Sequence, residues 1–342
     1  MRLYRVLPLA AIALLSACGG EGGTSGTPIT SGSASPPTST PGPTPTPTTG
    51  SLNTGEVKPS TGSAFLAATM SLTTLGGVSQ TNGIITGGLT ADRTTALDTP
   101  QFQASYSPSA GYSLSDAFTS TTFGSGQLSG DSTVPNGNGV VSFARLTGAV
   151  EDYLALYQQS TYTSSIKGSG YTTAKYGGTA GWQHTIVNGS TRATRLNYFA
   201  YGVPTPVASM PHTGIVKFAM LSSGNYATDS DLWFLSSGSG NVISVDFATG
   251  QVSGQLGLGG QNFFKSVVGG IGGIPLDGSI SGNTVMSSFT NASLSTSGRV
   301  SGQFRLLFVG PNADELVLTF VANDGTQAAV GAAIGLRDPY LT

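Results

Sequence analysis

The clearest alternation of apolar and polar positions lies near the C-terminus. In Val300–Phe308 the apolar side chains at 300, 304, 306 and 308 share one parity, the period of a half-buried β-strand. Gly310-Pro311 ends this run, and the four residues after it have room for at most one helical turn. Leu316–Val321 is a second apolar run, and a turn at 323–325 leads into Ala328–Leu336. We therefore predict three strands joined by two tight turns.

Short runs of the same kind precede this unit, which suggests that it completes a larger sheet. They are Gly214–Leu221, Leu232–Leu235, Val242–Phe247, Gln251–Leu258 and Val285–Thr290. Periodicity does not settle the structure of Asn262–Leu276, which is apolar and glycine-rich. Eight or so short antiparallel strands predict a sandwich or an up-and-down barrel. Glycines inside the strands (Gly254, Gly302, Gly331) favour the barrel, where they suit corners and bulges.

The earlier part of the chain is β-like with long loops. Asn188-Gly189 between Trp182–Val187 and Thr191–Tyr201 is a strong hairpin signal, with Leu196, Tyr198 and Ala200 on the opposite face from Asn197, Phe199 and Tyr201. Aromatic residues on both faces indicate a strand covered on both sides or one with a ligand-facing side. Further candidates are Gln101–Tyr106 and Val140–Leu146 as strands, Tyr153–Tyr157 as strand or helix, and Phe65–Leu72 as either.

Composition excludes several classes of protein. The 342 residues include 50 Gly but only 9% charged residues, and the net charge is −2 without a basic cluster. Nucleic acid is therefore not an expected partner. One cysteine, Cys18, allows no intramolecular disulfide and no cysteine-based zinc site. The two histidines, His184 and His212, are too few for a multi-histidine metal centre.

The N-terminus predicts export and lipidation. Arg2 and Arg5 precede the short apolar run Leu7–Leu15, which is typical of a signal peptide and too short to span a bilayer. Residues 15–18, Leu-Ser-Ala-Cys, resemble the bacterial lipobox, which implies cleavage before Cys18 and acylation of that residue. An ordinary signal peptide with a coincidental cysteine is the alternative. Glycines after Cys18, in place of acidic residues, resemble the pattern of outer-membrane sorting.

Residues 19–60 predict a disordered tether. Gly, Pro, Ser and Thr supply 34 of the 42 residues from Gly19 to Ser60, too little apolar surface to offset the entropy of ordering. The Pro-Thr alternation from Pro41 to Thr48 favours polyproline II. Such a tether reaches roughly 35 Å as a coil and about 130 Å as polyproline II.

Recognisable catalytic chemistry is missing from the sequence. It contains no G-x-S-x-G elbow, Walker loop, HExxH or dinucleotide fingerprint. Four weaker candidates each have a simpler interpretation. Asp314 and Glu315 are adjacent carboxylates, which a turn explains without catalysis. Asp229 and Asp231 are either a cation site or a solvated turn, and His212 is either a haem or metal ligand or a surface residue. Gly269–Gly273 is dense in glycine and is expected to be a loop. We expect no catalytic residue, no metal site and no cofactor.

Four segments resemble the transferrin-binding-protein-like surface lipoprotein family. They are FAYGVPTPVASMPHTG (199–214), VDFATGQVSG (245–254), VSGQF (300–304) and GPNADEL (310–316), of which the last is the most specific. The resemblance covers roughly Trp182–Asp338 well and residues 61–181 only by position. One departure is Val317-Leu318, where the family often has two glycines. The length leaves room for one lobe, where the transferrin receptors carry two, so transferrin binding itself is not carried over.

The resemblance implies an all-β chain with an irregular β handle domain followed by an eight-stranded antiparallel barrel. The expected order is a lipoprotein signal peptide at 1–18, the tether at 19–60, the handle at 61–207 and the barrel at 208–342. We predict a non-catalytic lipoprotein anchored in the outer membrane and exposed at the cell surface. Its expected role is to bind an external protein, haem or another solute with an iron-related role, through ligand-binding residues that the sequence does not identify. A structural or adhesive envelope lipoprotein is the alternative.

Overall fold

The computed structural model describes residues 58–59, 62–75, 78–79, 84–85, 93–97, 102–131, 139–165, 168–237, 241–263, 265, 267–294 and 299–339. Cys18 and nearly all of the predicted tether lie outside these residues. Apart from two short 3-10 helices, η2 (Ser125–Gln127) and η3 (Val207–Ser209), the elements in the described parts are strands. No helix among them is long and apolar enough to cross a membrane.

Strands β1 to β14 build the handle. Their bounds are β1 (Ala64–Leu75), β2 (Val78–Ser79), β3 (Ile84–Ile85), β4 (Thr94–Leu97), β5 (Gln103–Ser107), β6 (Gly111–Ser115), β7 (Ser120–Phe123), β8 (Leu128–Asp131), β9 (Gly139–Thr147), β10 (Val150–Gln158), β11 (Ser160–Ser165), β12 (Gly168–Thr173), β13 (Gly177–Asn188) and β14 (Thr191–Gly202). Seven of them form one antiparallel sheet in the order β4-β1-β14-β13-β10-β9-β8. The predicted hairpin is β13–β14, and Gly189 in its turn has the positive φ of 56° that this connection needs.

A smaller sheet, β5-β6-β7, covers one face of the handle sheet. The pairs β11-β12 and β2-β3 form two further sheets of two strands each. The buried residues between the two sheets include Phe123, Phe143, Trp182 and Phe199. Leu196 and Tyr198 pack on the opposite face of the handle sheet. The prediction that the aromatic strand is covered on both faces is therefore confirmed, and Tyr153–Tyr157 belongs to strand β10, not to a helix.

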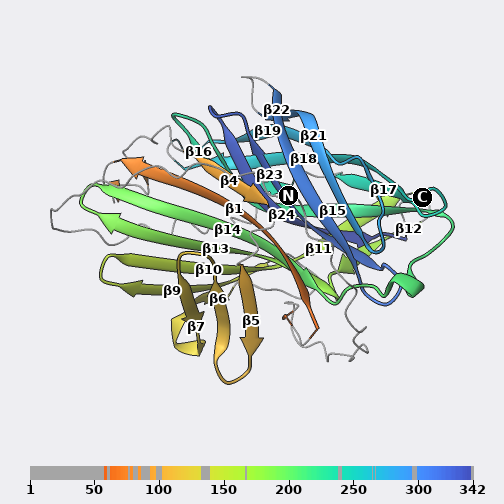
Figure 1. Ribbon diagram of the computed structural model, residues 1–342, viewed down its shortest axis with the longest axis horizontal. Coiled ribbons are helices and arrows are strands. Elements are labelled where there is room, and N and C mark those ends of the chain that lie inside the picture. Colours follow the sequence, from red (N-terminus) through yellow and green to blue (C-terminus); the bar gives the residue numbers. More distant parts are fainter. Residues whose placement is uncertain are drawn as a thin grey trace.

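Strands β15 to β24 build a closed barrel. Their bounds are β15 (Ile215–Ala227), β16 (Leu232–Ser237), β17 (Val242–Asp246), β18 (Gln251–Asn262), β19 (Val268–Pro275), β20 (Gly278–Ser279), β21 (Thr284–Leu294), β22 (Arg299–Val309), β23 (Glu315–Asn323) and β24 (Ala328–Arg337). Pairing runs from β15 through β17, β18, β19, β21, β22, β23 and β24 and closes where β24 pairs with β15. The eight-stranded antiparallel barrel predicted from the sequence is confirmed (Figure 1).

The eight positions are filled differently from the prediction. Strands β16 and β17 both pair with β15 and β18, at different heights, so they are two halves of one interrupted strand. The eighth position belongs to β19, from the stretch 262–276 that periodicity did not settle. Gly269–Gly273 lies inside that strand, so the prediction of a loop there was wrong.

Side chains fill the inside of the barrel. Phe218, Phe304, Phe308 and Phe320 are fully buried there, together with aliphatic residues from the other strands. Two of the predicted glycines leave room for this packing, because a Cβ at Gly302 would meet the Phe289 ring and one at Gly331 would meet the Phe320 ring. Gly302 pairs with Phe289 directly beside the register shift between Phe289 and Ala292, which fits the predicted bulge, and a second shift lies at Leu258/Gly259. The packed interior resembles the filled core of a small barrel.

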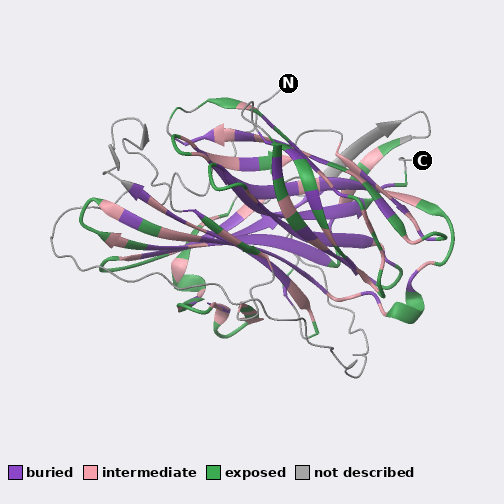
Figure 2. Cartoon of the chain, turned by 45° about the horizontal axis from the view of Figure 1, so that its top comes forward, coloured by how far each residue is buried: buried purple, intermediate pink, exposed green. Residues whose placement is uncertain are grey.

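The handle sheet packs against the outside of the barrel. Leu66, Met70 and Tyr198 of the handle share one buried cluster with Val317 and Ile334 on β23 and β24. These two barrel strands are therefore buried on both faces, which explains why the terminal runs are apolar at nearly every position. Figure 2 shows the long buried stretches on the strands at the centre of the molecule. The boundary at residues 207 and 208 stays a prediction.

Candidate functional site: the outer face of the handle

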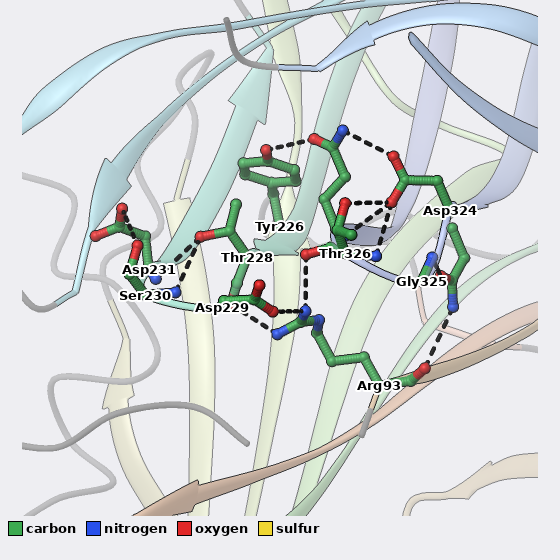
Figure 3. Close-up of polar contacts among 11 residues, drawn as sticks. Arg93, Tyr226, Thr228, Asp229, Ser230, Asp231, Asp324, Gly325 and Thr326 are labelled. Atoms are coloured by element: carbon green, nitrogen blue, oxygen red, sulfur yellow. Dashed lines mark hydrogen bonds and ion pairs between the residues drawn. The ribbon is translucent and has the colours of Figure 1, made fainter. Parts of the chain in front are cut away.

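Asp229 and Asp231 lie at one end of the barrel, in the turn between β15 and β16 (Figure 3). The buried guanidinium of Arg93, just before β4, forms an ion pair with Asp229. It also donates hydrogen bonds to the backbone oxygens of Thr228 at 2.8 Å and Thr326 at 2.7 Å. Arg93 therefore ties two barrel turns to the handle, which is a structural role that sequence reasoning missed.

Asp231 has protein partners of its own. Its Oδ1 lies 2.6 Å from Lys265 Nζ and accepts a hydrogen bond from Asn262 Nδ2 at 2.8 Å. Burial raises the pKa of Asp231, but hydrogen bonds from Lys265, Asn262 and Ser230 outweigh it and hold the pKa below its usual value. In the described parts of the chain no three His, Cys, Asp or Glu residues are grouped to hold a metal ion. The interpretation of the two acids as parts of a turn is the one that these contacts favour.

Glu315 joins the barrel to the handle. Its carboxylate is buried and accepts hydrogen bonds from the backbone N–H groups of Lys175 at 2.6 Å, Tyr176 at 3.0 Å and Gly177 at 2.9 Å. Burial raises its pKa to about 7, against the opposite effect of the three N–H donors. Asp314, by contrast, accepts the backbone N–H of Asn312 within the turn, at 3.2 Å. The two adjacent acids thus have separate structural partners.

The two histidines have different surroundings. His212 is exposed in the connection before β15, and no contact of its side chain marks a site. His184, on β13, is buried, and its Nδ1 lies 2.8 Å from Asp152 Oδ1 on β10. Trp182 Nε1 donates to the same oxygen at 3.2 Å. Cys18, the predicted lipidation site, lies outside the described residues.

The His184–Asp152 pair is part of a row of ionisable side chains across the handle sheet. The strand register places Arg195 opposite His184, His184 opposite Asp152, and Asp152 opposite Arg145. Directly opposed residues of antiparallel strands share a face, so all four side chains are on the face that β5-β6-β7 partly covers. With strands about 4.8 Å apart, the row spans about 14 Å.

A turn of the covering sheet presents an aromatic side chain above one end of this row. Asp116, in the turn between β6 and β7, has a fully buried carboxylate that forms an ion pair with Arg195 at 3.0 Å. Its other oxygen accepts the backbone N–H groups of Phe118 at 2.8 Å and Thr119 at 3.0 Å. The Phe118 ring stacks on the Arg195 guanidinium, 4.1 Å from Cζ, yet Phe118 remains 74% exposed.

Beyond the row, towards the tip of the handle, the sheet presents small and apolar residues. Ile186 is 48% exposed, and the register places it between Ala193 and Val150 on the same face as His184. We call the surface formed by Phe118, Arg145, Val150, Ile186 and Ala193 the handle ledge. It combines a fixed aromatic ring, an exposed arginine and an apolar strip.

One sequence signal points to this surface, the Asn188-Gly189 hairpin that brings Ile186 and Ala193 together. No sequence signal marks the neighbours of that hairpin, because the sheet order is not sequential and β13 pairs with β10, from which two other strands separate it along the chain. The position of Phe118 depends on Arg195, which follows 77 residues later in the numbering.

Comparison of the sequence with protein-family models and with curated proteins finds no match. Solved structures similar to this chain are those of transferrin-binding protein B and HpuA, the kind of protein that the sequence resembles. Intact Ap-TbpB, with N and C lobes, is 11% identical and has a TM-score of 0.39, over 82% of this chain and 79% of that one. HpuA from Kingella denitrificans, in complex with human haemoglobin, is 15% identical with a TM-score of 0.37, over 84% and 89%. Transferrin-binding protein B from serogroup B Neisseria meningitidis is 14% identical with a TM-score of 0.37, over 74% and 49%.

Proposed function

We propose that this protein is a lipid-anchored outer-membrane protein that binds an external protein through its surface and catalyses no reaction. The observation that carries the proposal is the filled barrel. Phenylalanine and aliphatic side chains occupy the interior where barrels that carry small molecules keep their ligand. The seam between handle and barrel is also packed with buried side chains. Recognition is therefore assigned to the outer surface and its loops.

The proposed anchor is Cys18, with residues 19–60 as the tether, 61–207 as the handle and 208–342 as the barrel. The lipobox-like residues before Cys18 and the composition of the tether support this arrangement. Several buried acyl chains hold a protein on a membrane far more firmly than one. A tether of this length would allow the lobe to meet large partners away from the lipid surface.

Iron-carrying proteins of a host are the proposed class of partner. The support for this class is the sequence resemblance of residues 199–214, 245–254, 300–304 and 310–316 to the transferrin-binding-protein-like lipoproteins. Haem or another solute is the second ligand class that the same resemblance suggests. Neither class requires a catalytic residue. The acids Asp116, Asp152, Asp229 and Asp231 are each engaged with a basic side chain of the protein.

Binding of the purified full-length protein to transferrin and to haemoglobin, each measured by surface plasmon resonance, tests the proposal. Titration with haem tests the solute alternative, and protease shaving of intact cells tests exposure at the surface. We expect saturable binding of at least one of the proteins and loss of the handle and barrel on shaving. Absence of saturable binding, combined with a weakened envelope or attachment in a deletion strain, would favour a structural or adhesive lipoprotein instead.

A further inference from the structure

We propose that Asn188 and Gly189, at the turn between β13 and β14, form a self-modification site, where water converts the asparagine into aspartate and isoaspartate without an enzyme. The inference stands independently of the proposed function. Three features of the turn carry it: an exposed side chain that nothing holds, a neighbouring backbone nitrogen with open space beside it, and a strand end that can open locally.

The Asn188 side chain is accessible to attack. Asn188, Gly189 and Ser190 are all exposed. Among the residues that the structure describes, none hydrogen-bonds the Asn188 side chain or the Gly189 N–H. A Cβ at Gly189 would meet nothing within 4 Å, so the space beside this nitrogen is open. The nucleophilic nitrogen and the side-chain amide are therefore adjacent, unshielded and in contact with water.

The reaction needs only these two residues and water. The Gly189 nitrogen gives its proton to hydroxide and attacks the Asn188 side-chain carbon Cγ, which closes a five-membered imide ring. The Cγ–Nδ2 bond breaks, and its nitrogen leaves as ammonia with a proton taken from water. Water then adds to one of the two ring carbonyls. Opening at Cγ leaves aspartate, and opening at the backbone carbonyl leaves isoaspartate, in which the chain continues through the side chain.

Ring closure requires the Asn188 backbone to turn away from its extended conformation. Asn188 is the last residue of β13, and its pairing with Thr191 is the last pair of the ladder. The hydrogen bond from Thr191 Oγ1 to the Asn188 backbone oxygen, at 2.8 Å, lies at the surface. The end of a hairpin opens locally at little cost in free energy. Gly189, with a φ of 56°, has no side chain to oppose the movement.

The surroundings of the other asparagines set Asn188 apart. Side-chain hydrogen bonds hold nearly all of the others that the structure describes, namely Asn197, Asn225, Asn241, Asn262, Asn283, Asn291 and Asn323. Asn312 is exposed, but the residue after it is the buried Ala313, whose methyl group stands beside the attacking nitrogen. Asn188 is therefore the described asparagine that combines an unheld side chain with a following glycine.

The product alters the middle of the handle sheet at one end. Strands β13 and β14 are neighbours in that sheet, and Arg192, close to the turn, forms an ion pair with Glu151 of β10. Each conversion adds a negative charge at the turn, on a chain of net charge −2. Isoaspartate also lengthens the backbone by one carbon, so the Asn188–Thr191 pair loses its register. We expect the turn end of the hairpin to be looser in aged molecules.

The test is incubation of the folded full-length protein in neutral and mildly alkaline buffer, followed by trypsin digestion and mass spectrometry. Asn188 is the only asparagine in the tryptic peptide 176–192, so its conversion is measured separately from the other Asn-Gly pairs of the chain. We expect conversion about 10-fold faster at Asn188 than at Asn312, with isoaspartate among the products. N188Q should stay unmodified, because its longer side chain would have to close a less favourable six-membered ring. A sample digested without incubation sets the starting level.

The same protein unfolded in urea shows whether the fold protects the site. If the folded protein keeps Asn188 intact while the unfolded one is converted, the hairpin protects this asparagine and the proposal is overturned. Equal rates at Asn188 and Asn312 would overturn it as well. Hydrogen exchange at the turn should be faster in aged wild type than in N188Q aged alongside it, and equal exchange would contradict the loosening. None of these results depends on binding of transferrin or haemoglobin, so the proposed function stands or fails separately.

Discussion

The carboxylate of Glu315, the first residue of barrel strand β23, accepts the backbone N–H of Gly177, the first residue of handle strand β13, at 2.9 Å. Two more N–H groups of the same segment bind this carboxylate. A buried acid thus fixes the handle on the barrel. The neighbouring contacts strengthen this joint, since Thr205 Oγ1 donates to the backbone oxygen of Gly310 at 2.6 Å.

The Glu315 joint predicts a specific dependence of stability on pH. Its pKa rises from 4.5 in the unfolded chain to about 7 in the folded one, so the folded state binds the proton more tightly. The stability that this group contributes is therefore fully present below pH 4.5 and is lost as the pH rises through 7. Relative to E315Q, which does not titrate, wild type should lose about 3 kcal/mol of unfolding free energy across this window. Urea unfolding of both proteins from pH 4 to pH 8 measures the difference, and parallel curves would contradict the raised pKa.

The Arg93 cluster predicts a stability effect in the barrel from a handle residue. R93M removes the donors to the backbone oxygens of Thr228 and Thr326 at a side chain that is 1% exposed. Leaving buried acceptors without partners should cost about 2–4 kcal/mol in unfolding free energy. The control is the exposed Arg299, which donates a hydrogen bond to Asn291 Oδ1 at 3.1 Å. R299M should change the unfolding free energy by less than about 0.5 kcal/mol. Equal melting temperatures for the two variants would contradict the proposal that Arg93 stabilises the contact between the handle and the barrel turns.

Periodicity was enough to predict the strands of the barrel where one face of a strand is apolar and the other is polar, whereas the closed eight-stranded barrel was implied by the family resemblance. In β22 the residues of one parity, Phe304 and Phe308 among them, do point into the barrel. The second half of the same strand is buried on both faces, because Leu307 and Val309 meet the handle. Strand β19 is rich in glycine and shows no alternation of apolar and polar side chains along its sequence. Its place in the barrel is therefore known only from its backbone pairing with β18.

The handle and its ledge were harder to predict, because their geometry depends on contacts between distant parts of the chain. Strand β1 pairs with β14, and Thr69 Oγ1 donates to Asn197 Oδ1 at 2.8 Å. Nothing in the local sequence of either strand marks that partner. The sequence placed Glu315 in a turn, whereas it is the first residue of β23 directly after that turn, and its role in the joint needs the loop at 175–177, which only the fold places nearby.

Substitution by alanine is expected to affect stability very differently at two glycines in the barrel. A Cβ at Gly302 would lie 2.4 Å from the Phe289 ring and 2.1 Å from the backbone oxygen of Val321, whereas one at Gly269 would meet nothing within 4 Å. Overpacking of this kind against backbone should cost about 3 kcal/mol in G302A. G269A should change the unfolding free energy by less than about 0.5 kcal/mol. Denaturant unfolding compares them, and similar midpoints for the two variants would contradict the packing of Phe289 over Gly302.

The lipobox-like residues predict that attachment to membranes depends on one sulfur atom. Acylation requires the thiol of Cys18, and residues 19–60 contain too little apolar surface to hold the lobe on lipid by themselves. C18S should therefore move the protein from the membrane pellet to the soluble fraction, with handle and barrel still folded. S16A keeps the cysteine and serves as the control that should stay in the pellet. Detergent phase partitioning and fractionation measure both variants, and a C18S protein that remains with the membranes would show that something other than Cys18 anchors it.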